Sequence, residues 1–371
     1  MRQPLLLAMG AFFLVAPTGG PTPVARGGFD APPVSLGPVV ADDAAGGGVL
    51  LKVMNYNVKG LPWPVTDGRS AELAAIGDRL RAMRTHGATP DVVVLQEAFS
   101  SDARAIAARA GYAYVAYGPG RDDVAPASGG QPMPTRYPWR GEGYGAYLSS
   151  GLVLMSDYPI LGARRAAFPR TACAGYDCLA NKGVLLARIA VPGLPVPVEI
   201  MTAHMNSRKP TRTPIAHANE AFVRQMAALD RFVAANSDPR LPMIFGADLN
   251  LDSDPQRIAA LRQSSARWSG GGAGAAATFA ICGKPSTRCR PAIGFGAIAQ
   301  SKRNNDWQLA FASAHVMVRP VSAAIRFAPD PAGLALSDHQ AVLVSYRLSV
   351  KGHSSAALAQ NAEGIKRARP S

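Results

Sequence analysis

The chain has 371 residues and a 48% hydrophobic content, which is enough for one large folded domain or two small ones. Its formal net charge of +14 favours polyanionic partners: nucleic acid, anionic lipid headgroups or phosphorylated substrates. The basic residues are scattered, apart from a cluster at Lys366, Arg367 and Arg369. Charge alone therefore excludes none of these partners, and arginine-rich codon usage explains it equally well.

The N-terminus has the layout of an export signal. Arg2 precedes an apolar run over residues 5–16, which has signal-peptide length and is too short to span a membrane comfortably. We expect a signal peptide over residues 1–25, without a defined cleavage site, and hence a secreted or periplasmic protein. An uncleaved anchor and a misassigned start are the alternatives. No later stretch is long and apolar enough to span a bilayer.

The rest of the chain divides by composition into a linker, a folded domain and a tail. Residues 26–48 are rich in Gly, Pro, Ala and Asp, as is typical of a processed or disordered linker. Residues 49–348 carry the regular patterns of a single catalytic domain. Residues 349–371 are polar and basic, and we expect this tail to fray.

Within the folded domain, short apolar runs alternate with helical patterns. Several of the runs are apolar throughout, as in sheets that are covered on both faces. Residues 71–84 follow a plausible N-cap at Ser70, and residues 213–235 carry apolar side chains at helical spacing. These patterns predict a layered α/β protein in which one sheet can pack on another. The predicted strands are 50–56, 92–95, 152–155, 184–189, 198–202, 243–245 and 341–346.

Two glycine-rich loops and four cysteines stand outside these patterns. The loop over residues 118–145 is long enough to predict a functional role, whereas residues 269–274 suit a surface excursion. The cysteines form two close pairs in a chain that we expect to be exported, which favours two local disulfides. Zinc ligation is disfavoured, because neither pair has the spacing of a zinc knuckle. The pairs are Cys173 with Cys178 and Cys282 with Cys289.

Polar side chains recur at the ends of the apolar runs, where loops expose them from a rigid sheet. One such residue is usually a turn or cap residue, but eight of them indicate a shared site. Carboxylates and amides are hard ligands that suit Mg²⁺, and the two histidines add acid–base and phosphate-contact groups. This set is what phosphodiester hydrolysis requires. The eight residues are Asn57, Glu97, His204, Asp248, Asn250, Asp306, Asp338 and His339.

The order of the motifs around these residues resembles a known family. N-Y-N-V at 55–58, L-Q-E-A-F at 95–99, G-A-D-L-N at 246–250, N-D-W at 305–307 and S-D-H at 337–339 are similar to the motifs of the endonuclease/exonuclease/phosphatase superfamily. This superfamily includes pancreatic-type deoxyribonucleases, abasic-site endonucleases, inositol phosphatases and neutral sphingomyelinases. The resemblance implies a four-layer α/β sandwich, in which two packed β-sheets are flanked by helices, and in-line attack of water on phosphorus.

The resemblance also implies a metal site. Glu97 is similar to the family's principal metal ligand, with Asn57 beside it and Asp338 near the metal. The implied cofactor is Mg²⁺, with Mn²⁺ or Co²⁺ as substitutes.

Five catalytic roles follow from the same motifs. His339 resembles the general base that activates water, and Asp306 resembles the carboxylate that orients its imidazole. Asp248 and Asn250 resemble the residues that position the nucleophile and the phosphate. His204 resembles the histidine that binds the phosphate and stabilises the transition state.

Within the superfamily, several features resemble the bacterial sphingomyelinases C. They are K-V-M-N-Y-N-V at 52–58, Q-E-A-F at 96–99, A-H-M-N-S at 203–207, and a cysteine, glycine and aspartate before N-K-G at 181–183. This resemblance makes Asn181 and Lys182 candidates for substrate binding. For Lys182 we favour the alternative that it is a solvated lysine in a turn. The branch's second cysteine is missing after the histidine motif, and Cys178 can replace it with a local bridge. Residues 291–299 are the candidate for the branch's membrane-binding hairpin, with a buried strand or ordinary loop as the alternative.

Three hypotheses follow for the function. The first is a secreted monomer that meets a phospholipid membrane surface and cleaves sphingomyelin to ceramide and phosphocholine. The second is a secreted nuclease of the same fold, which the +14 charge favours. The third is a non-catalytic binding protein, and the presence of every expected catalytic residue type argues against it.

Overall fold

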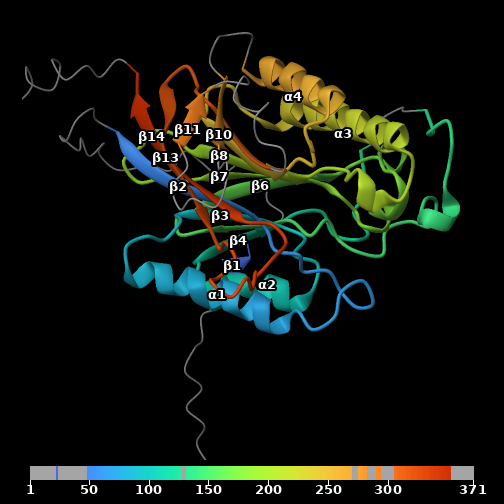
Figure 1. The fold of residues 1–371 in the computed structure, drawn as a ribbon. Coiled ribbons are helices and arrows are strands. Elements are labelled where there is room, and N and C mark those ends of the chain that lie inside the picture. The colour runs from blue at the N-terminus through green and yellow to red at the C-terminus, as the bar shows by residue number, and fades with distance from the viewer. Residues whose placement is uncertain are drawn as a thin grey trace, which may run out of the picture.

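Two β-sheets pack face to face between two pairs of helices (Figure 1). The computed structural model describes residues 48–126, 131–269 and 305–351, together with the backbone of short strands at 22–23, 275–281 and 290–293. Helices α1 (Ser70–Thr85) and α2 (Ser101–Ala110) cover one sheet, and α3 (Ile215–Asn236) and α4 (Pro255–Trp268) cover the other. The predicted four-layer α/β sandwich is thus confirmed.

The first sheet has β2 and β3 near its centre, paired in parallel. The outer pairings of β5, β14 and β13 are antiparallel. The strand order is β1 (Thr22–Pro23), β4 (Tyr114–Tyr117), β5 (Val153–Ser156), β3 (Val92–Gln96), β2 (Val49–Asn57), β14 (Ala341–Val350) and β13 (Val316–Arg326).

The second sheet is built around the parallel pair of β8 and β9. Its other pairings are antiparallel. The strand order is β11 (Arg290–Ile293), β10 (Ala275–Ile281), β12 (Asp306–Phe311), β9 (Met243–Asp248), β8 (Val198–His204), β7 (Gly183–Ile189) and β6 (Ile160–Ala167).

Among the described residues the three larger hydrophobic clusters lie between the sheets and beneath each pair of helices, and a small fourth cluster contains Met133 and Ala174. The strands near the centre of each sheet are therefore buried on both faces, which explains why their sequences are apolar throughout. The part beneath α3 contains Phe222, Met226, Leu229 and Val233, the residues whose helical spacing predicted this helix. Burying each of these side chains contributes about 1.5–3 kcal/mol.

The helix boundaries differ slightly from the sequence prediction. Ser70 is the first helical residue of α1 and not its N-cap, because its hydroxyl donates to Asp102 on α2. Helix α4 was not predicted, although Asp254 caps it by accepting hydrogen bonds from two backbone N–H groups and Pro255 occupies its first turn. Short 3₁₀ helices lie between the main elements at η1 (Pro138–Arg140), η2 (Arg170–Ala172), η3 (Gly175–Leu179) and η4 (Lys209–Thr211).

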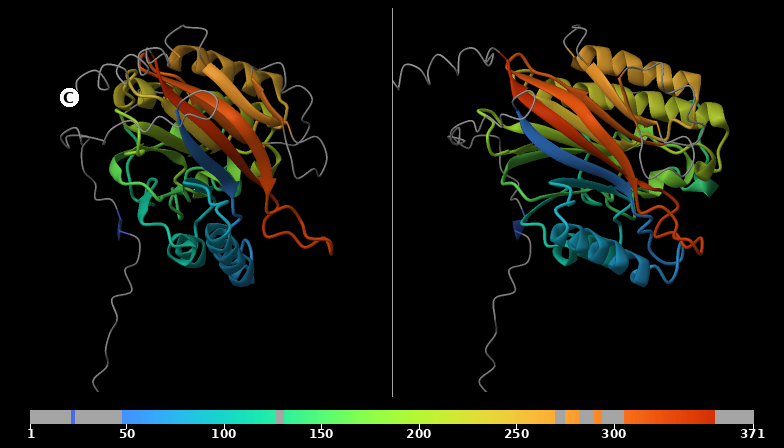
Figure 2. Two further views of the ribbon diagram at one scale, coloured as in Figure 1. Left: turned by 90° about the vertical axis from the view of Figure 1, so that its left-hand side faces the viewer. Right: turned by 60° about the vertical axis from the view of Figure 1, so that its left-hand side comes forward.

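The strand directions gather many loops at one edge of the sandwich. The carboxyl ends of β2, β3 and β4 lie at this edge of the first sheet, and those of β8 and β9 lie at the same edge of the second. The loop over residues 327–340 extends beyond the sheet here, close to the loop that precedes α1 (Figure 2). Most of the polar residues singled out in the sequence lie on these loops or at these strand ends.

Several expectations fall wholly or mainly outside the described residues. They include the signal peptide, most of the linker, nearly all of the basic tail, Cys282, Cys289 and most of the loop at 269–274. Of the expected hairpin at 291–299, residues 291–293 belong to β11 and the remainder is outside the described part. Among the described helices, none has the length and apolar character of a membrane span.

Candidate active site

The site is built on neighbouring strand ends of the second sheet. His204 ends β8 and is paired in register with Asp248, which ends β9. Asp306 begins β12 and is paired with the same Asp248 from the other side. Because paired residues lie side by side across a sheet, these three side chains form one row at its edge.

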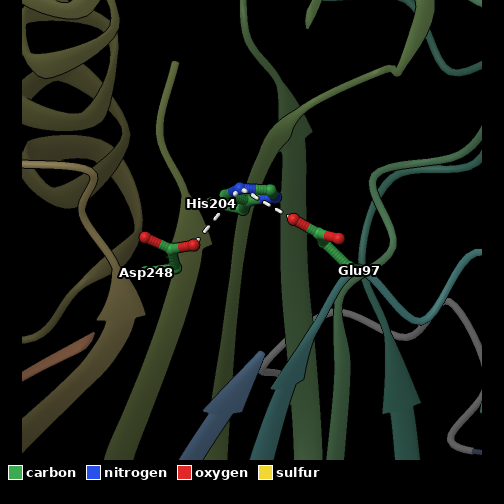
Figure 3. Close-up of side chains that lie close together, drawn as sticks. All are labelled: Glu97, His204 and Asp248. Carbon is green, nitrogen blue, oxygen red and sulfur yellow. Dashed lines mark ion pairs between the residues drawn. The ribbon is translucent and has the colours of Figure 1, made fainter. Parts of the chain in front are cut away.

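The first sheet adds Glu97 opposite this row. Figure 3 shows the imidazole of His204 between the carboxylates of Glu97 and Asp248. The His204 Nε2 atom lies 3.5 Å from Asp248 Oδ2 and 3.9 Å from Glu97 Oε1. Glu97 has a φ of +57° and Asn250 one of +50°, a left-handed backbone that residues other than glycine seldom adopt. Such backbone strain is concentrated at functional sites.

Asn57 joins the two sheets at this point. Its amide nitrogen donates one hydrogen bond of 2.9 Å to Glu97 Oε1 and another of 2.9 Å to Asp248 Oδ2. Its amide oxygen accepts the backbone N–H of Lys59. Asn57 therefore lies in the site as predicted, but in this structure its polar atoms hold the two carboxylates and the following loop in place.

The partly exposed His339 and the buried Asp306 form a dyad. The Nδ1 atom of His339 lies 2.6 Å from Asp306 Oδ2, and its Nε2 atom lies 3.9 Å from Asp248 Oδ2. Ser337 fixes the S-D-H loop, since its hydroxyl donates to the carbonyl of Asn57 and accepts the N–H of His339. The dyad thus directs the free imidazole nitrogen toward the carboxylate row.

The buried charges alter one another's pKa. Burial, and secondarily the neighbouring carboxylate Asp306, raises the pKa of Asp248 to about 6, and burial also raises the pKa of Glu97. Burial opposes the charged form of His339, but attraction and hydrogen bonding by Asp306 outweigh it and raise the pKa of the imidazole to about 10. The site therefore holds several carboxylates whose negative charge the protein only partly balances.

This donor set fits a hard divalent cation. Glu97, His204 and Asp248 each offer a ligand atom, and these atoms lie within 4.8 Å of one another; Asp248, Asp306 and His339 form a second such group. Carboxylate oxygens are the ligands that Mg²⁺ and Mn²⁺ prefer. The negative charge of the carboxylates keeps His339 protonated, whereas a base that accepts a proton has to start unprotonated. A cation bound there would offset this charge and favour the neutral imidazole.

The sequence model of the Endonuclease/Exonuclease/phosphatase family matches residues 54–339, from the end of β2 to the histidine of the dyad. The chain belongs to this family. Its fold is that of metal-dependent phosphodiesterases and phosphatases. No curated protein matches the sequence significantly.

Solved structures with a similar fold include sphingomyelinase C from Streptomyces griseocarneus, which is 20% identical with a TM-score of 0.52 over 80% of this chain and 99% of that one. A beta toxin structure from Staphylococcus aureus is 18% identical, with a TM-score of 0.50 over 79% and 99% of the two chains. Humanized D. rerio TDP2 is 17% identical, with a TM-score of 0.50 over 80% and 98%. At these identities the likeness shows the shared fold alone.

Two residues predicted for the family site lie apart from its centre. The carboxylate of Asp338 is 56% exposed and pairs with Lys59 Nζ at 3.0 Å, so it belongs to neither of the two potential ligand groups. Asn181 is buried, and its amide donates to the backbone carbonyls of Gly120 and Asp123. In this structure Asn181 therefore anchors the 118–126 loop beside the site, and its amide hydrogens are already used.

Lys182 corrects a sequence-based interpretation. We favoured a solvated turn lysine, but its side chain is only 6% exposed. Its Nζ atom donates to Asp177 Oδ2 at 2.7 Å and to the carbonyl of Met205 at 3.0 Å, and it lies 3.3 Å from His204 Nε2. A buried positive charge thus stands beside His204. Burial first, and then the charges of Lys182 and His339, lowers the pKa of His204 well below its usual value.

The Cys173–Cys178 disulfide, which was predicted, closes the segment that carries Asp177. Asp177 also accepts the backbone N–H of Ser207 at 2.6 Å and its hydroxyl at 3.1 Å. The bridge therefore fixes an acid that holds both Lys182 and the loop after β8.

The family site rests on buried polar residues that we did not predict. The amide nitrogen of Gln96 donates to Asn55 Oδ1 at 2.8 Å and to Thr202 Oγ1 at 3.0 Å, and Asn55 donates to the carbonyl of Ala247. These bonds link the sheets directly behind the row of His204, Asp248 and Asp306. The signal was available, because Asn55 and Gln96 are polar residues inside otherwise apolar strands.

Lys182→Met is expected to lower the free energy of unfolding by about 3 kcal/mol, because it leaves the Asp177 carboxylate buried without its charged partner. Urea denaturation measures this loss. The double variant Lys182→Met/Asp177→Asn should recover part of the stability but none of the turnover that the lysine supports. A change in the free energy of unfolding of less than about 0.5 kcal/mol is usual for solvated surface residues. Such a small change in Lys182→Met would show that the lysine is solvated.

Proposed function

We propose that the protein is a secreted phosphodiesterase that hydrolyses a phospholipid, such as sphingomyelin to ceramide and phosphocholine, with Mg²⁺ as its cofactor. The observation that carries the proposal is the convergence of Glu97, Asp248, His204 and the His339–Asp306 dyad at one edge of the sandwich. These residues combine a potential cation site, a histidine base and a histidine that can contact a phosphate oxygen.

Glu97 and Asp248 would hold the metal. The second group of potential ligand residues, Asp248, Asp306 and His339, lies beside them. When bound, it would neutralise charge on the phosphate and lower the pKa of a water molecule. Asn57 would keep the two carboxylates at a fixed separation through its hydrogen bonds to both. Mn²⁺ and Co²⁺ are alternative cations for the same oxygen ligands.

The chain's own residues account for the proton transfers and for phosphate binding. His339 Nε2 accepts a proton from water as the water oxygen bonds to phosphorus, and the bond from phosphorus to the leaving alkoxide breaks. Asp306 holds the Nδ1 side of the imidazole, so that Nε2 is the free nitrogen. Lys182 and His204, which lie next to each other, would contact a non-bridging phosphate oxygen and stabilise its growing charge.

Four observations support the lipid substrate and the secreted location. The sequence resembles the sphingomyelinases C at its N-K-G and A-H-M-N-S segments, and one fold neighbour at a TM-score of 0.52 is a sphingomyelinase C. The N-terminal apolar run and the Cys173–Cys178 disulfide both suit an exported protein. We expect the enzyme to act as a monomer.

A second candidate function is a nuclease of the same fold. The net charge of +14 is the specific observation that favours it, since polyanions bind to strongly basic proteins. The metal site and the dyad serve either substrate equally well, because both reactions cleave a phosphodiester.

A substrate panel with chelator controls tests the proposal. Sphingomyelin vesicles, phosphatidylcholine vesicles and plasmid DNA are each incubated with the enzyme in Mg²⁺, and phosphocholine release and DNA nicking are measured. We expect release of phosphocholine from sphingomyelin, its loss to background in EDTA, and its return on adding excess Mg²⁺. DNA nicking without lipid turnover would replace the lipid hypothesis with the nuclease. Undiminished turnover in EDTA would exclude the metal.

A further inference from the structure

A separate cavity of about 400 Å³ lies beneath the segment at residues 131–147. Its walls come from this segment and from η2, and the Cys173–Cys178 disulfide forms part of its floor. Figure 1 shows the segment extending from the body of the molecule beyond the end of α3. The side chains that matter for binding are Arg136, Tyr144, Met133 and Arg170.

Among the described residues that line the cavity, Glu142 is the one acid, and its carboxylate is held by hydrogen bonds within the protein. Glu142 is buried, and its Oε1 atom lies 2.8 Å from His217 Nε2 and accepts the backbone N–H of Gly175 at 2.7 Å. Its Oε2 atom accepts the backbone N–H of Tyr137 at 2.9 Å. The carboxylate therefore anchors the segment, and its single negative charge is outnumbered by the two arginines that line the cavity.

The two arginines at the cavity have no such partners. Within the described part of the chain, neither Arg136 nor Arg170 forms an ion pair with a carboxylate, and both side chains are exposed. Three further cations are exposed or partly exposed on the neighbouring η1 and η4: Arg140, Lys209 and Arg212. A cavity with two unpaired guanidinium groups and an apolar floor fits a phosphate group attached to an apolar body.

The surface around the cavity is unusually aromatic. The side chains of Trp139, Tyr144, Tyr147 and Tyr176 are between 43% and 70% exposed, although a buried aromatic residue contributes far more stability. Trp and Tyr with this exposure are typical of proteins at a membrane–water interface, where the ring meets lipid and the polar tip meets water. Together with the arginines they favour an anionic bilayer over a soluble anion.

The cavity lies beside the proposed catalytic site. Arg170 and the disulfide also line a smaller hollow that reaches Asn181 and Lys182. Lys182 in turn lies 3.3 Å from His204 Nε2. A bilayer that contacts the cavity would therefore lie next to the edge where the substrate has to enter.

We propose that this cavity binds the phosphate-bearing headgroup of an anionic phospholipid, while the surrounding aromatic side chains contact the bilayer interface. The site is distinct from the catalytic one, and the lipid bound there is not hydrolysed. The proposal concerns binding alone, so it can be tested whether or not the assigned substrate is correct.

The test compares the full chain in Mg²⁺ with two charge-matched variants. Arg136→Gln/Arg170→Gln alters the cavity, whereas Arg79→Gln/Arg231→Gln removes two exposed arginines from α1 and α3. Co-sedimentation measures affinity for vesicles of pure phosphatidylcholine and for vesicles with one-fifth phosphatidylglycerol. Melting curves and turnover of a water-soluble phosphodiester establish that each variant is folded.

We expect the wild type to prefer the anionic vesicles. The cavity variant should lose roughly 30-fold in affinity for them, because that is the affinity that two basic residues contribute at an anionic surface. The α1/α3 variant should lose far less. Equal losses in both variants would attribute binding to general charge and overturn the proposal. A cavity variant that keeps its vesicle affinity but loses binding to a single-stranded oligonucleotide would also overturn the proposal. That result would assign the cavity to nucleic acid.

Fluorescence gives a second readout that does not depend on hydrolysis. Brominated lipids should quench the emission of the wild type on anionic vesicles, and the quenched component should disappear in Trp139→Phe. Quenching that is identical in the two proteins would place Trp139 away from the bilayer and contradict the docking geometry. If sphingomyelin turnover fails while both binding results hold, only the proposed substrate is wrong.

Discussion

His339→Ala is expected to lower kcat/KM for phosphodiester hydrolysis by about 100-fold or more, because it removes the imidazole that Asp306 orients and whose Nε2 atom can accept a proton from water. His204 cannot substitute, since burial first, and then the charges of Lys182 and His339, lower its pKa well below the usual value and make it a weak base. Steady-state kinetics at saturating Mg²⁺ measures the loss, with KM and kcat determined separately. Most of the loss should appear in kcat, because the base acts in the transition state.

The matched control is His315→Ala. His315 is an exposed histidine next to the start of β13, at the opposite end of the sheet from the S-D-H loop. Its replacement should leave kcat within about twofold, as surface substitutions do. A rate for His339→Ala that matches this control would exclude His339 as the base.

A double-mutant cycle separates the two members of the dyad. Asp306 lies 2.6 Å from His339 Nδ1, so Asp306→Asn should slow turnover by disturbing the orientation and tautomer of the imidazole. In the His339→Ala background the same substitution should have little further effect, because residues that act as one unit are not additive. Full additivity would give Asp306 a separate role, such as metal binding.

Arg257→Met is expected to lower the free energy of unfolding by about 3–5 kcal/mol, the range for removing one partner of a buried charged network. Arg257 is fully buried, stacks over the ring of Phe222, and donates five hydrogen bonds. Four of its acceptors are backbone carbonyls, which would be buried without donors in the variant. Urea denaturation monitored by tryptophan fluorescence measures the change.

The same substitution should also disturb the site. The guanidinium holds the carbonyls of Asn206 and Asn250, which belong to the loops after β8 and β9. Arg231→Met, at an exposed position of α3, is the control and should change stability by less than about 0.5 kcal/mol. A loss below about 1 kcal/mol for Arg257→Met would show that the loops hold their positions without it, since typical single hydrogen bonds contribute that much.

The pattern of strand ends in the sequence was enough to predict which polar residues the structure brings together. His204, Asp248 and Asp306 each stand at the boundary of an apolar run, and the pairing of the strands brings them together. Glu97 was found in the same way. These predictions needed only the knowledge that polar groups at the ends of neighbouring strands share one edge.

The roles of Lys182, Asn181 and Asp338 could not be predicted in the same way. All three lie in loops, and their roles depend on partners that are distant in space or sequence. Lys182 is buried because the loop after β8 and Asp177 enclose it, whereas Asp338 faces Lys59 at the surface. Residue type and spacing do not specify such contacts, which depend on how each loop folds back over the sheet.

The supporting network was missed for a different reason. Asn55, Gln96 and Arg257 make no contact with a reacting group, so motif chemistry gives them no role. Their polar side chains are tolerated inside the protein because most of their hydrogen-bonding groups find a partner there, although the Gln96 Oε1 atom has none among the described residues. Only the packed structure reveals those partners.

Calorimetric titration of the metal-free protein with Mg²⁺ and with Mn²⁺, before and after Glu97→Gln, tests most directly whether these strand ends form a cation site. Glu97→Gln keeps the side-chain shape and removes one negative charge, and Glu220→Gln on the surface of α3 is the control. We expect saturable binding in the wild type and the control. The cation affinity of Glu97→Gln should fall by more than about tenfold, because replacing a residue that only supports a metal ligand already lowers affinity by roughly that factor. Equal affinity in all three proteins would contradict a metal site at Glu97.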